Sequence, residues 1–216
     1  AYSVAAGGLV GAASVIPGYA SGISASSFTG SVDASKAAES ITGGLVGMTG
    51  SSGMGVVYLQ NNRVSASLVA GGGEAGGIVG QLDYFASLSW SVAEIGKISV
   101  VGTNGLIGGA VAVSNFETAV VGNIVSVVSV EATTPKALAA LVAVASTAGY
   151  EEGLPYRGTA TFANYFIDAS GKLSGSSGPS PVALSDPTAG LLAAAGSSEQ
   201  SWDLNGADLP HLTGPN

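Results

Sequence analysis

The chain has 216 residues and a formal net charge of −8, with only 9% charged and 46% hydrophobic residues. Disordered tails combine low hydrophobicity with high charge, and solvated helical bundles are rich in Lys and Glu, so this composition excludes both. The 34 glycines follow no three-residue period, which excludes collagen. The length allows a sizeable core, and we predict a single domain over residues 1–216.

The titratable residues also limit the partners and cofactors. The six Lys and Arg residues are scattered along the chain, whereas a nucleic-acid or anionic-lipid surface needs them clustered. Cysteine is absent and His211 is the only histidine, which excludes disulfides and multi-His zinc sites. No apolar run is long enough to span a bilayer. We therefore expect no metal, no cofactor, no nucleic acid and no transmembrane segment.

One short phrase recurs along the chain. It reads Gly-Gly-Leu-Val-Gly at 7–11 and 43–47, Gly-Gly-Ile-Val-Gly at 76–80, Asn-Gly-Leu-Ile-Gly at 104–108 and, in degenerate form, Ala-Ala-Leu-Val-Ala at 139–143. The aliphatic pairs follow each other at intervals of 36, 33, 28 and 35 residues, and such periods indicate stacked repeats. In a solenoid the glycines let neighbouring turns approach closely, and the pairs form the core. The predicted core residues are Leu9, Val10, Leu45, Val46, Ile78, Val79, Leu106 and Ile107.

The segments between the phrases are typical of short strands. They are rich in β-branched residues and are bounded by Gly, Ser and Asn, as at 24–32, 56–59, 64–69, 98–101, 118–130 and 159–166. In the segment 64–69, Val64, Ala66 and Leu68 alternate with serines, so we expect the two sets to face opposite ways. The pattern predicts a mainly β fold, a parallel β-solenoid resembling a β-helix.

Three segments carry helix signals instead. Thr134-Pro135 precedes an Ala/Leu-rich run and has the form of an N-cap followed by proline at the first helical position. Asp186-Pro187 has the same form, and 33–39 is long enough for one short turn. We therefore predict a few short peripheral helices. At 134–141 we favour the helix over a fifth copy of the phrase.

The repeated phrase, followed by a small-residue strand, resembles the GLUG motif of large bacterial surface adhesins and immunoglobulin-cleaving surface peptidases. The closing segment 159–216 is similar too: Asn164-Tyr165-Phe166-Ile167-Asp168 precedes Ser-Gly, and Trp202 and Gly206 precede Leu-Pro-His-Leu at 209–212. The degenerate fourth and fifth phrases depart from the pattern. The resemblance implies a β-helix-like solenoid in an extracellular setting, without shared catalytic residues.

Four candidates for chemistry have simpler explanations. Gly71-x-Gly73-x-x-Gly76 matches a dinucleotide fingerprint, with Glu94 in the position of the ribose-binding acid, but a helix must follow such glycines and a further repeat phrase follows here. A Ser-His-Asp site would have to use His211, but the sequence has no nucleophile-elbow motif to accompany it, so a surface or packing role is the simpler interpretation. The adjacent glutamates at 151 and 152 would point to opposite faces of a strand. Glycan cleavage by a pair of acids is therefore a weaker hypothesis. Between 203 and 208 an Asx turn is the simpler interpretation than a calcium loop.

The beginning of the chain suggests how the protein works. The first phrase starts at residue 7, which leaves little room for a cap on the first turn, and residues 1–20 carry no charge. An uncapped sheet edge can pair with another chain. We expect a non-enzymatic extracellular protein that assembles with itself into a fibre or appendage, with Ala1, Tyr2, Ser3 and Val4 completing a neighbour's sheet. The alternatives are an adhesin module that binds glycan or protein on a surface and, second, a glycan-active β-helix enzyme.

Overall fold

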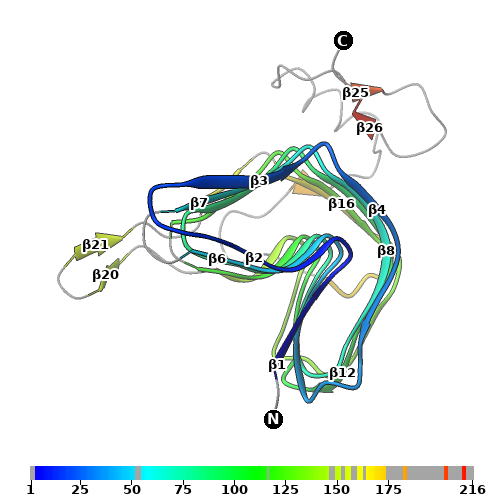
Figure 1. The fold of residues 1–216 in the computed structure, drawn as a ribbon. Helices are drawn as coiled ribbons and strands as arrows, with labels where there is room; N and C mark the ends of the chain where they lie inside the picture. Colours follow the sequence, from blue (N-terminus) through cyan, green and yellow to red (C-terminus); the bar gives the residue numbers. More distant parts are fainter. Residues whose placement is uncertain are drawn as a thin grey trace.

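The computed structural model describes residues 3–51, 55–115, 117–145, 149–151, 154–156, 160–162, 164–173, 182–183, 202–203 and 211–212. The strands wind into a parallel β-solenoid of about four turns (Figure 1). Each turn adds one strand to each of four parallel sheets, which we call A to D in the order in which the chain visits them. The predicted mainly β, parallel solenoid is confirmed.

Sheets A and B meet at a sharp corner on the concave side of the molecule (Figure 1). Sheet A contains β1 (Ser3–Gly7), β5 (Glu39–Gly43), β9 (Gly73–Gly76), β13 (Leu106–Gly108) and β18 (Ala137–Ala139). Sheet B contains β2 (Val10–Val15), β6 (Val46–Ser51), β10 (Val79–Leu82), β14 (Val111–Ser114) and β19 (Val142–Ala145).

Sheets C and D form the convex side. Sheet C contains β3 (Ala20–Ser24), β7 (Val56–Gln60), β11 (Ala86–Ser89), β15 (Ala119–Val121) and β22 (Ala160–Phe162). Sheet D contains β4 (Ser27–Ala34), β8 (Arg63–Ala70), β12 (Val92–Thr103), β16 (Ile124–Val127), β17 (Val130–Thr134), β23 (Tyr165–Asp168) and β24 (Val182–Ala183). Two antiparallel pairs lie outside these sheets: β20 (Gly149–Glu151) with β21 (Leu154–Tyr156), and β25 (Trp202–Asp203) with β26 (His211–Leu212).

The turns enclose an L-shaped cross-section with two arms (Figure 1). Sheets B and C enclose one arm, and sheet A and the second half of sheet D enclose the other. Side chains alternate across each strand: along β8, Val64, Ala66 and Leu68 are buried and the intervening serines are half-buried, as predicted. The buried aliphatic side chains of successive turns form one continuous core.

The recurring phrase forms the corner between sheets A and B, which we call the glycine corner (residues 7–10, 43–46, 76–79, 108–111 and 139–142). Backbone hydrogen bonds link the turns in register there: the Leu9 N–H donates to the Leu45 carbonyl at 3.0 Å, and the Leu45 N–H donates to the Ile78 carbonyl at 2.9 Å. A Cβ on Gly44 would overlap the carbonyl oxygen of Gly77 in the next turn. Glycine is therefore required at this position by the close approach of the turns.

The fourth rung differs from the prediction. The Ile78 N–H donates to Ala110 at 2.9 Å, and the Ala110 N–H donates to Leu141 at 3.0 Å. Ala110 and Val111 therefore form the fourth rung, whereas Leu106 and Ile107 lie four residues earlier, in β13. The stacking requires two small residues before the aliphatic pair, and Gly108-Gly109 supplies them. The phrase is not recognisable in the sequence because alanine replaces Leu or Ile at position 110.

The predicted helices are not found among the described residues. Residues 134–141 form the end of β17, a turn and β18, so the helix favoured there is wrong and the fifth copy of the phrase is the correct interpretation. Helix propensity is a weak preference, and Leu141, itself fully buried, continues the core column of Leu45, Ile78 and Ala110. At 33–39 a turn at Ser35 joins β4 to β5. The segment after Asp186 lies outside the described residues. Within the described part of the chain, no helix has the length and apolar character needed to cross a bilayer.

Candidate assembly surface at the first turn

The first turn leaves an edge of every solenoid sheet open. Strands β1, β2, β3 and β4 each lie at the end of their sheet and pair on one side only, with β5, β6, β7 and β8. The outer N–H and C=O groups of an edge strand are available to another strand. The described part of the first turn thus offers a row of backbone hydrogen-bonding groups around the L-shaped end.

The core is also open at this end. Leu9 is 44% exposed, whereas Leu45 and Ile78, which occupy the same column in the next two turns, are fully buried. Val10, Ala13, Val15 and Ile23 pack against the core but are only partly buried. The first turn therefore presents side chains that interior turns cover with a neighbour.

The two arms of this end differ. The Phe28 ring on β4 lies where side chains on Gly8 and Gly30 would otherwise be, and it fills the end beside the glycine corner. No such ring covers the arm between β2 and β3 in the described structure, and the loop between these strands exposes Ile16 and Tyr19 by 63% and 64%. We call the end of this arm, formed by β2, the loop 16–19 and β3, the open arm.

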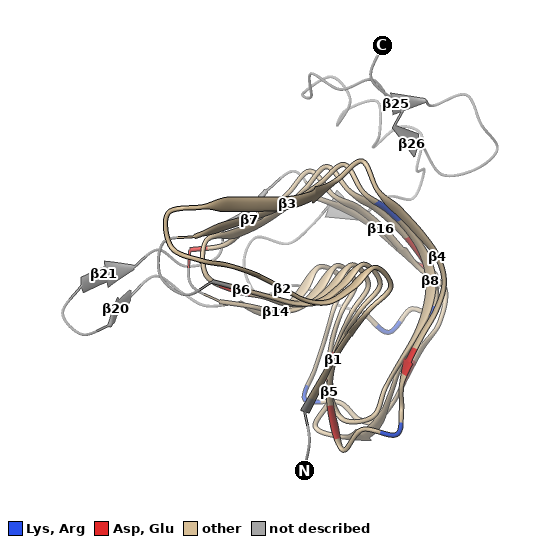
Figure 2. Cartoon of the chain, viewed as in Figure 1, with Lys and Arg blue, Asp and Glu red and all other residues tan. Residues whose placement is uncertain are grey.

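The open arm carries no charge. Residues 1–32 contain no ionisable side chain other than two tyrosines, although the whole chain has 20 Asp, Glu, Lys and Arg residues. Figure 2 shows β1, β2 and β3 without a charged residue. Sheet D, in contrast, carries Arg63, Glu94, Lys97 and Glu131, which form two ion pairs of 2.8 and 2.6 Å between neighbouring strands. An uncharged end that exposes Leu9, Ile16 and Tyr19 within an acidic protein is a surface suited to association.

A second corner joins sheets C and D, and we call it the asparagine corner (residues 25–27, 61–63, 90–92, 122–124 and Asn164). Here a side-chain oxygen accepts an N–H from the preceding turn: Asn62 from Ser26 at 3.1 Å, Ser91 from Asn62 at 3.1 Å, Asn123 from Ser91 at 3.0 Å and Asn164 from Asn123 at 2.9 Å. Amide groups of the asparagines also donate to carbonyls of the preceding turn.

Ser26 begins this ladder in the first turn. Its hydroxyl donates to the Ser24 carbonyl at 3.0 Å, as the Ser91 hydroxyl donates to Ser89 at 3.0 Å. Ser91 also accepts an N–H from the turn before it, whereas no described residue donates to the Ser26 oxygen. Ser26 therefore occupies the same position as Ser91 of an interior turn, but its hydroxyl oxygen accepts no hydrogen bond from a described residue.

The asparagine ladder was not recognised in the sequence. One signal was available: an Asn or Ser immediately precedes the sheet D strands β4, β8, β12, β16 and β23, as at Asn62, Asn123 and Asn164. The residue before it has a positive φ in four turns, between 48° and 66°. This signal was obscured because Ala, Asn, Trp and Gly all occupy that position.

The opposite end of the described turns is covered at the glycine corner and in part of sheet D, whereas β18, β19 and β22 pair on one side only. Leu141, in the last copy of the glycine corner, is fully buried, in contrast to Leu9. Strand β24 continues sheet D beside β23. Leu173 is buried in the core, and the Lys172 ammonium donates to the Val130 carbonyl at 2.8 Å. The Asp168 carboxylate holds this segment by accepting N–H groups of Ser170, Gly171 and Leu173.

The residues predicted for assembly lie at or near the open end. Ser3 and Val4 belong to β1 and pair with Glu39 and Ser40 of β5, and Val4 is 42% exposed. Ala1 and Tyr2 lie outside the described residues. Of the predicted core residues, Leu45, Val46, Ile78, Val79 and Ile107 are fully buried, whereas Val10 and Leu106 are half-buried and Leu9 is exposed.

Most candidates for chemistry are not brought together; Asp203 and His211 are the exception, as partners in the antiparallel pair of β25 and β26. The glycines at 71, 73 and 76 lead into strand β9 rather than a helix, and Glu94 pairs with Arg63 at 2.8 Å. His211 and Asp203 lie in β26 and β25, Glu151 lies in β20, and residue 152 is outside the described part. No group of three metal-ligating side chains occurs within the described ranges.

One pair of carboxyl groups lies on the outer side of the glycine corner. Glu74 of β9 points away from the core, because its neighbour Ala75 faces inward, and Asp83 follows β10. Desolvation, followed by repulsion from Asp83, raises the pKa of Glu74 to about 7. Desolvation also raises the pKa of Asp83, against hydrogen bonds from Asn115 and Gln81. One oxygen of each carboxyl is buried and has no hydrogen-bond partner among the described residues.

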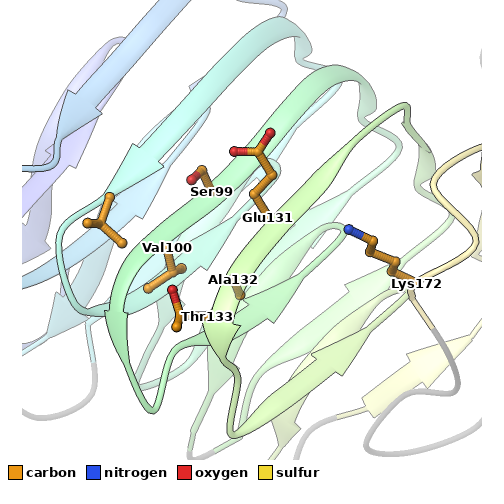
Figure 3. Close-up of a pocket in the computed structure, with 7 residues that line it drawn as sticks. Ser99, Val100, Glu131, Ala132, Thr133 and Lys172 are labelled. Carbon is orange, nitrogen blue, oxygen red and sulfur yellow. The ribbon is translucent and has the colours of Figure 1, made fainter.

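A shallow depression of about 410 Å³ lies on the outer side of sheet D, where Lys172 approaches β12 and β17 (Figure 3). Its two charged groups already have partners: Glu131 pairs with Lys97 at 2.6 Å, and Lys172 donates to Val130 at 2.8 Å. The depression therefore offers little to a charged ligand.

Comparison of the chain with family models, with curated proteins and with solved structures finds no match.

Proposed function

We propose that this protein is a non-enzymatic structural protein that works by associating with itself through the open end of its first turn. The observation that carries the proposal is the contrast between Leu9, 44% exposed, and its fully buried equivalents Leu45 and Ile78. The open acceptor of Ser26 and the unpaired outer edges of β1–β4 support it. An extracellular setting, as a fibre or appendage component, follows from the resemblance to GLUG-repeat proteins and is part of the proposal.

The energetic reason is that a partner covers apolar side chains and pairs sheet edges in one contact. Covering such surface contributes about 25 cal/mol per Å², and pairing satisfies strand groups that otherwise depend on water. Uncharged ends of two acidic molecules can approach with little local repulsion.

The test is sedimentation velocity of the full chain over a wide concentration range, with electron microscopy of the same samples. We expect the average mass to rise with concentration. In the double variant Ile16→Asp/Tyr19→Asp, association should be lost, because each substitution places a charge on the open arm. A matched control, Val101→Asp/Val128→Asp, changes side chains that are 59% and 58% exposed outside the first turn, and it should associate like the parent. A parent chain that stays monomeric at every concentration contradicts the proposal.

A further inference from the structure

We propose that the carboxyl groups of Glu74 and Asp83 form a binding site for one calcium ion on the concave side of the solenoid. Strands β9 and β10, which position the two residues, are the middle strands of sheets A and B. The site is therefore built by interior turns and does not depend on self-association through the first turn. Its ligands are oxygen atoms, so it differs from the cysteine and histidine sites that the composition excludes.

The fold holds the two carboxyl groups together from two different sheets. Glu74 pairs in register with Ile41 of β5, and a Cβ on Gly80 of β10 would meet the Ile41 Cγ2 atom at 2.8 Å. The outer faces of sheets A and B are therefore in contact beside Glu74. Asp83 directly follows β10, and its charge lies close enough to raise the pKa of Glu74.

Each carboxyl group has one buried oxygen that accepts no hydrogen bond from a described residue. Asp83 is only 8% exposed, and its Oδ2 accepts from the Gln81 amide, whereas its Oδ1 has no partner. The Oε2 atom of Glu74 is buried without a partner as well. Burying a carboxylate oxygen without a donor costs free energy, and the two neighbouring acids also repel each other. Both oxygens therefore call for a positively charged partner.

No basic side chain in the described part of the chain supplies that charge. The two ion pairs there join Arg63 to Glu94 and Lys97 to Glu131, away from both carboxyl groups of the site. A proton can neutralise Glu74 only below its raised pKa of about 7. Above that pH a divalent cation compensates both carboxylates at once, whereas in metal-free protein their repulsion remains.

The neighbouring side chains suit calcium. The amide groups of Gln81 and Asn115 both form hydrogen bonds to Asp83, so their carbonyl oxygens lie near the same carboxyl. Calcium takes about six to eight oxygen ligands from carboxylates, amide carbonyls and water in a flexible geometry, whereas magnesium demands a near-ideal octahedron and keeps most of its water. A site of two carboxylates and two amides, completed by water, therefore favours calcium. The bound ion would join sheet A to sheet B.

Calcium binding by the full chain is tested by isothermal titration calorimetry at about pH 7.5 after treatment with a chelator. Extracellular modules bind calcium at roughly 10⁻⁴–10⁻³ M, so the titration extends to the millimolar range. We expect one site per chain. Thermal unfolding of the same samples should show a melting temperature that is roughly 5 °C higher in calcium than in chelator, once calcium exceeds its dissociation constant about 100-fold.

Glu74→Gln and Asp83→Asn each remove one charged ligand with little change in size. Either variant should weaken binding about tenfold or more and lose most of the calcium-dependent rise in melting temperature. Glu39→Gln is the matched control, because it removes the same charge from an exposed position of β5 in sheet A. It should bind calcium like the parent.

Three results would overturn the site: a parent chain that binds no calcium, binding that Glu39→Gln reduces as much as Glu74→Gln, and binding that neither Glu74→Gln nor Asp83→Asn changes. The last result would place the ion elsewhere on the chain. Each of them would leave the proposed self-association standing, because that proposal is tested by sedimentation and by substitutions in the first turn.

Discussion

At the glycine corner the turns approach each other because side chains are absent, whereas at the asparagine corner they are joined by side chains. A Cβ on Gly77 would overlap the carbonyl oxygen of Gly109 in the next turn. At the other corner, Asn123 accepts the Ser91 N–H at 3.0 Å and donates to the Leu88 carbonyl at 3.1 Å. The glycine corner depends on the absence of side chains, and the asparagine corner depends on hydrogen bonds made by side chains. The two corners should therefore respond differently to substitution.

The comparison explains which residues each corner accepts. Any added atom at the glycine corner meets backbone that cannot move without disturbing the next turn. The asparagine corner requires an oxygen that accepts an N–H, and Asn62, Ser91, Asn123 and Asn164 all supply one. Consequently one corner keeps a recognisable phrase, and the other alternates between two residue types.

The largest effect is expected from Gly77→Ala. The added methyl group would overlap the Gly109 carbonyl, and overpacking against rigid backbone should lower the free energy of unfolding by about 3 kcal/mol or more. Urea denaturation followed by far-ultraviolet circular dichroism measures this loss. The control is Gly50→Ala, because a Cβ there meets no atom within 4 Å. Equal stability of the two variants would show that the glycine corner is not sterically closed.

The next effect concerns Asn123→Ala. This substitution removes the hydrogen bonds to Ser91, Leu88 and Asn164 and leaves buried polar groups unsatisfied, which should cost about 2–4 kcal/mol in the same denaturation experiment. Asn123→Ser is the informative companion, because Ser91 already fills this column in the third turn. It should recover roughly half of the loss. No difference between Ala and Ser would mean that the accepted N–H contributes little.

The same contrast explains what could be predicted from the sequence. The Gly-Gly-aliphatic phrase is readable because sterics fix its residue types, and it predicted the solenoid and three of its rungs. It failed at Ala110, where a smaller side chain fills the aliphatic position. The ladder at Asn62 and Asn123 was missed because polar satisfaction allows Ser as well. The helix expected after Thr134 was wrong because local propensity ignores the ladder to the preceding turn.

The candidate surface was predictable in part. The uncharged start indicated an uncharged surface, and the structure adds that the Phe28 ring fills the end beside the glycine corner, whereas no ring covers the arm between β2 and β3 in the described structure. That distinction depends on Phe28, whose ring lies against Gly8 and Gly30. No periodicity in the sequence shows which glycines a ring will meet across the core.

The outer side of the glycine corner adds a pH dependence to the stability of the fold. The pKa of Glu74 is raised from 4.5 to about 7 in the folded state. The folded protein therefore binds more protons than the unfolded chain between these values, and its stability should fall as the pH rises from about 4.5 to about 7. The shift of Asp83 acts in the same direction. For a half-buried carboxyl, solvent screening limits the change to roughly 1–2 kcal/mol.

Glu74→Gln tests this origin, because the amide cannot titrate and fills the same space. Thermal unfolding of the parent and the variant at several pH values should show a smaller slope for the variant between pH 5 and 7, and a higher melting temperature at pH 7.5. A variant whose slope matches that of the parent would assign the pH dependence to other groups.

The smallest effect is expected from Ala25→Gly, at the left-handed position of the asparagine corner. Ala25 has a φ of 48°, which a Cβ disfavours by about 1 kcal/mol. Glycine removes this cost but gains freedom in the unfolded chain, so the net stabilisation should be only about 0.5 kcal/mol. Ala20→Gly, in strand β3 where φ is not positive, should instead destabilise by a similar amount. Opposite signs for the two variants in parallel urea titrations would show that the corner selects its residues by backbone conformation as well as by hydrogen bonding; equal signs would remove that second requirement.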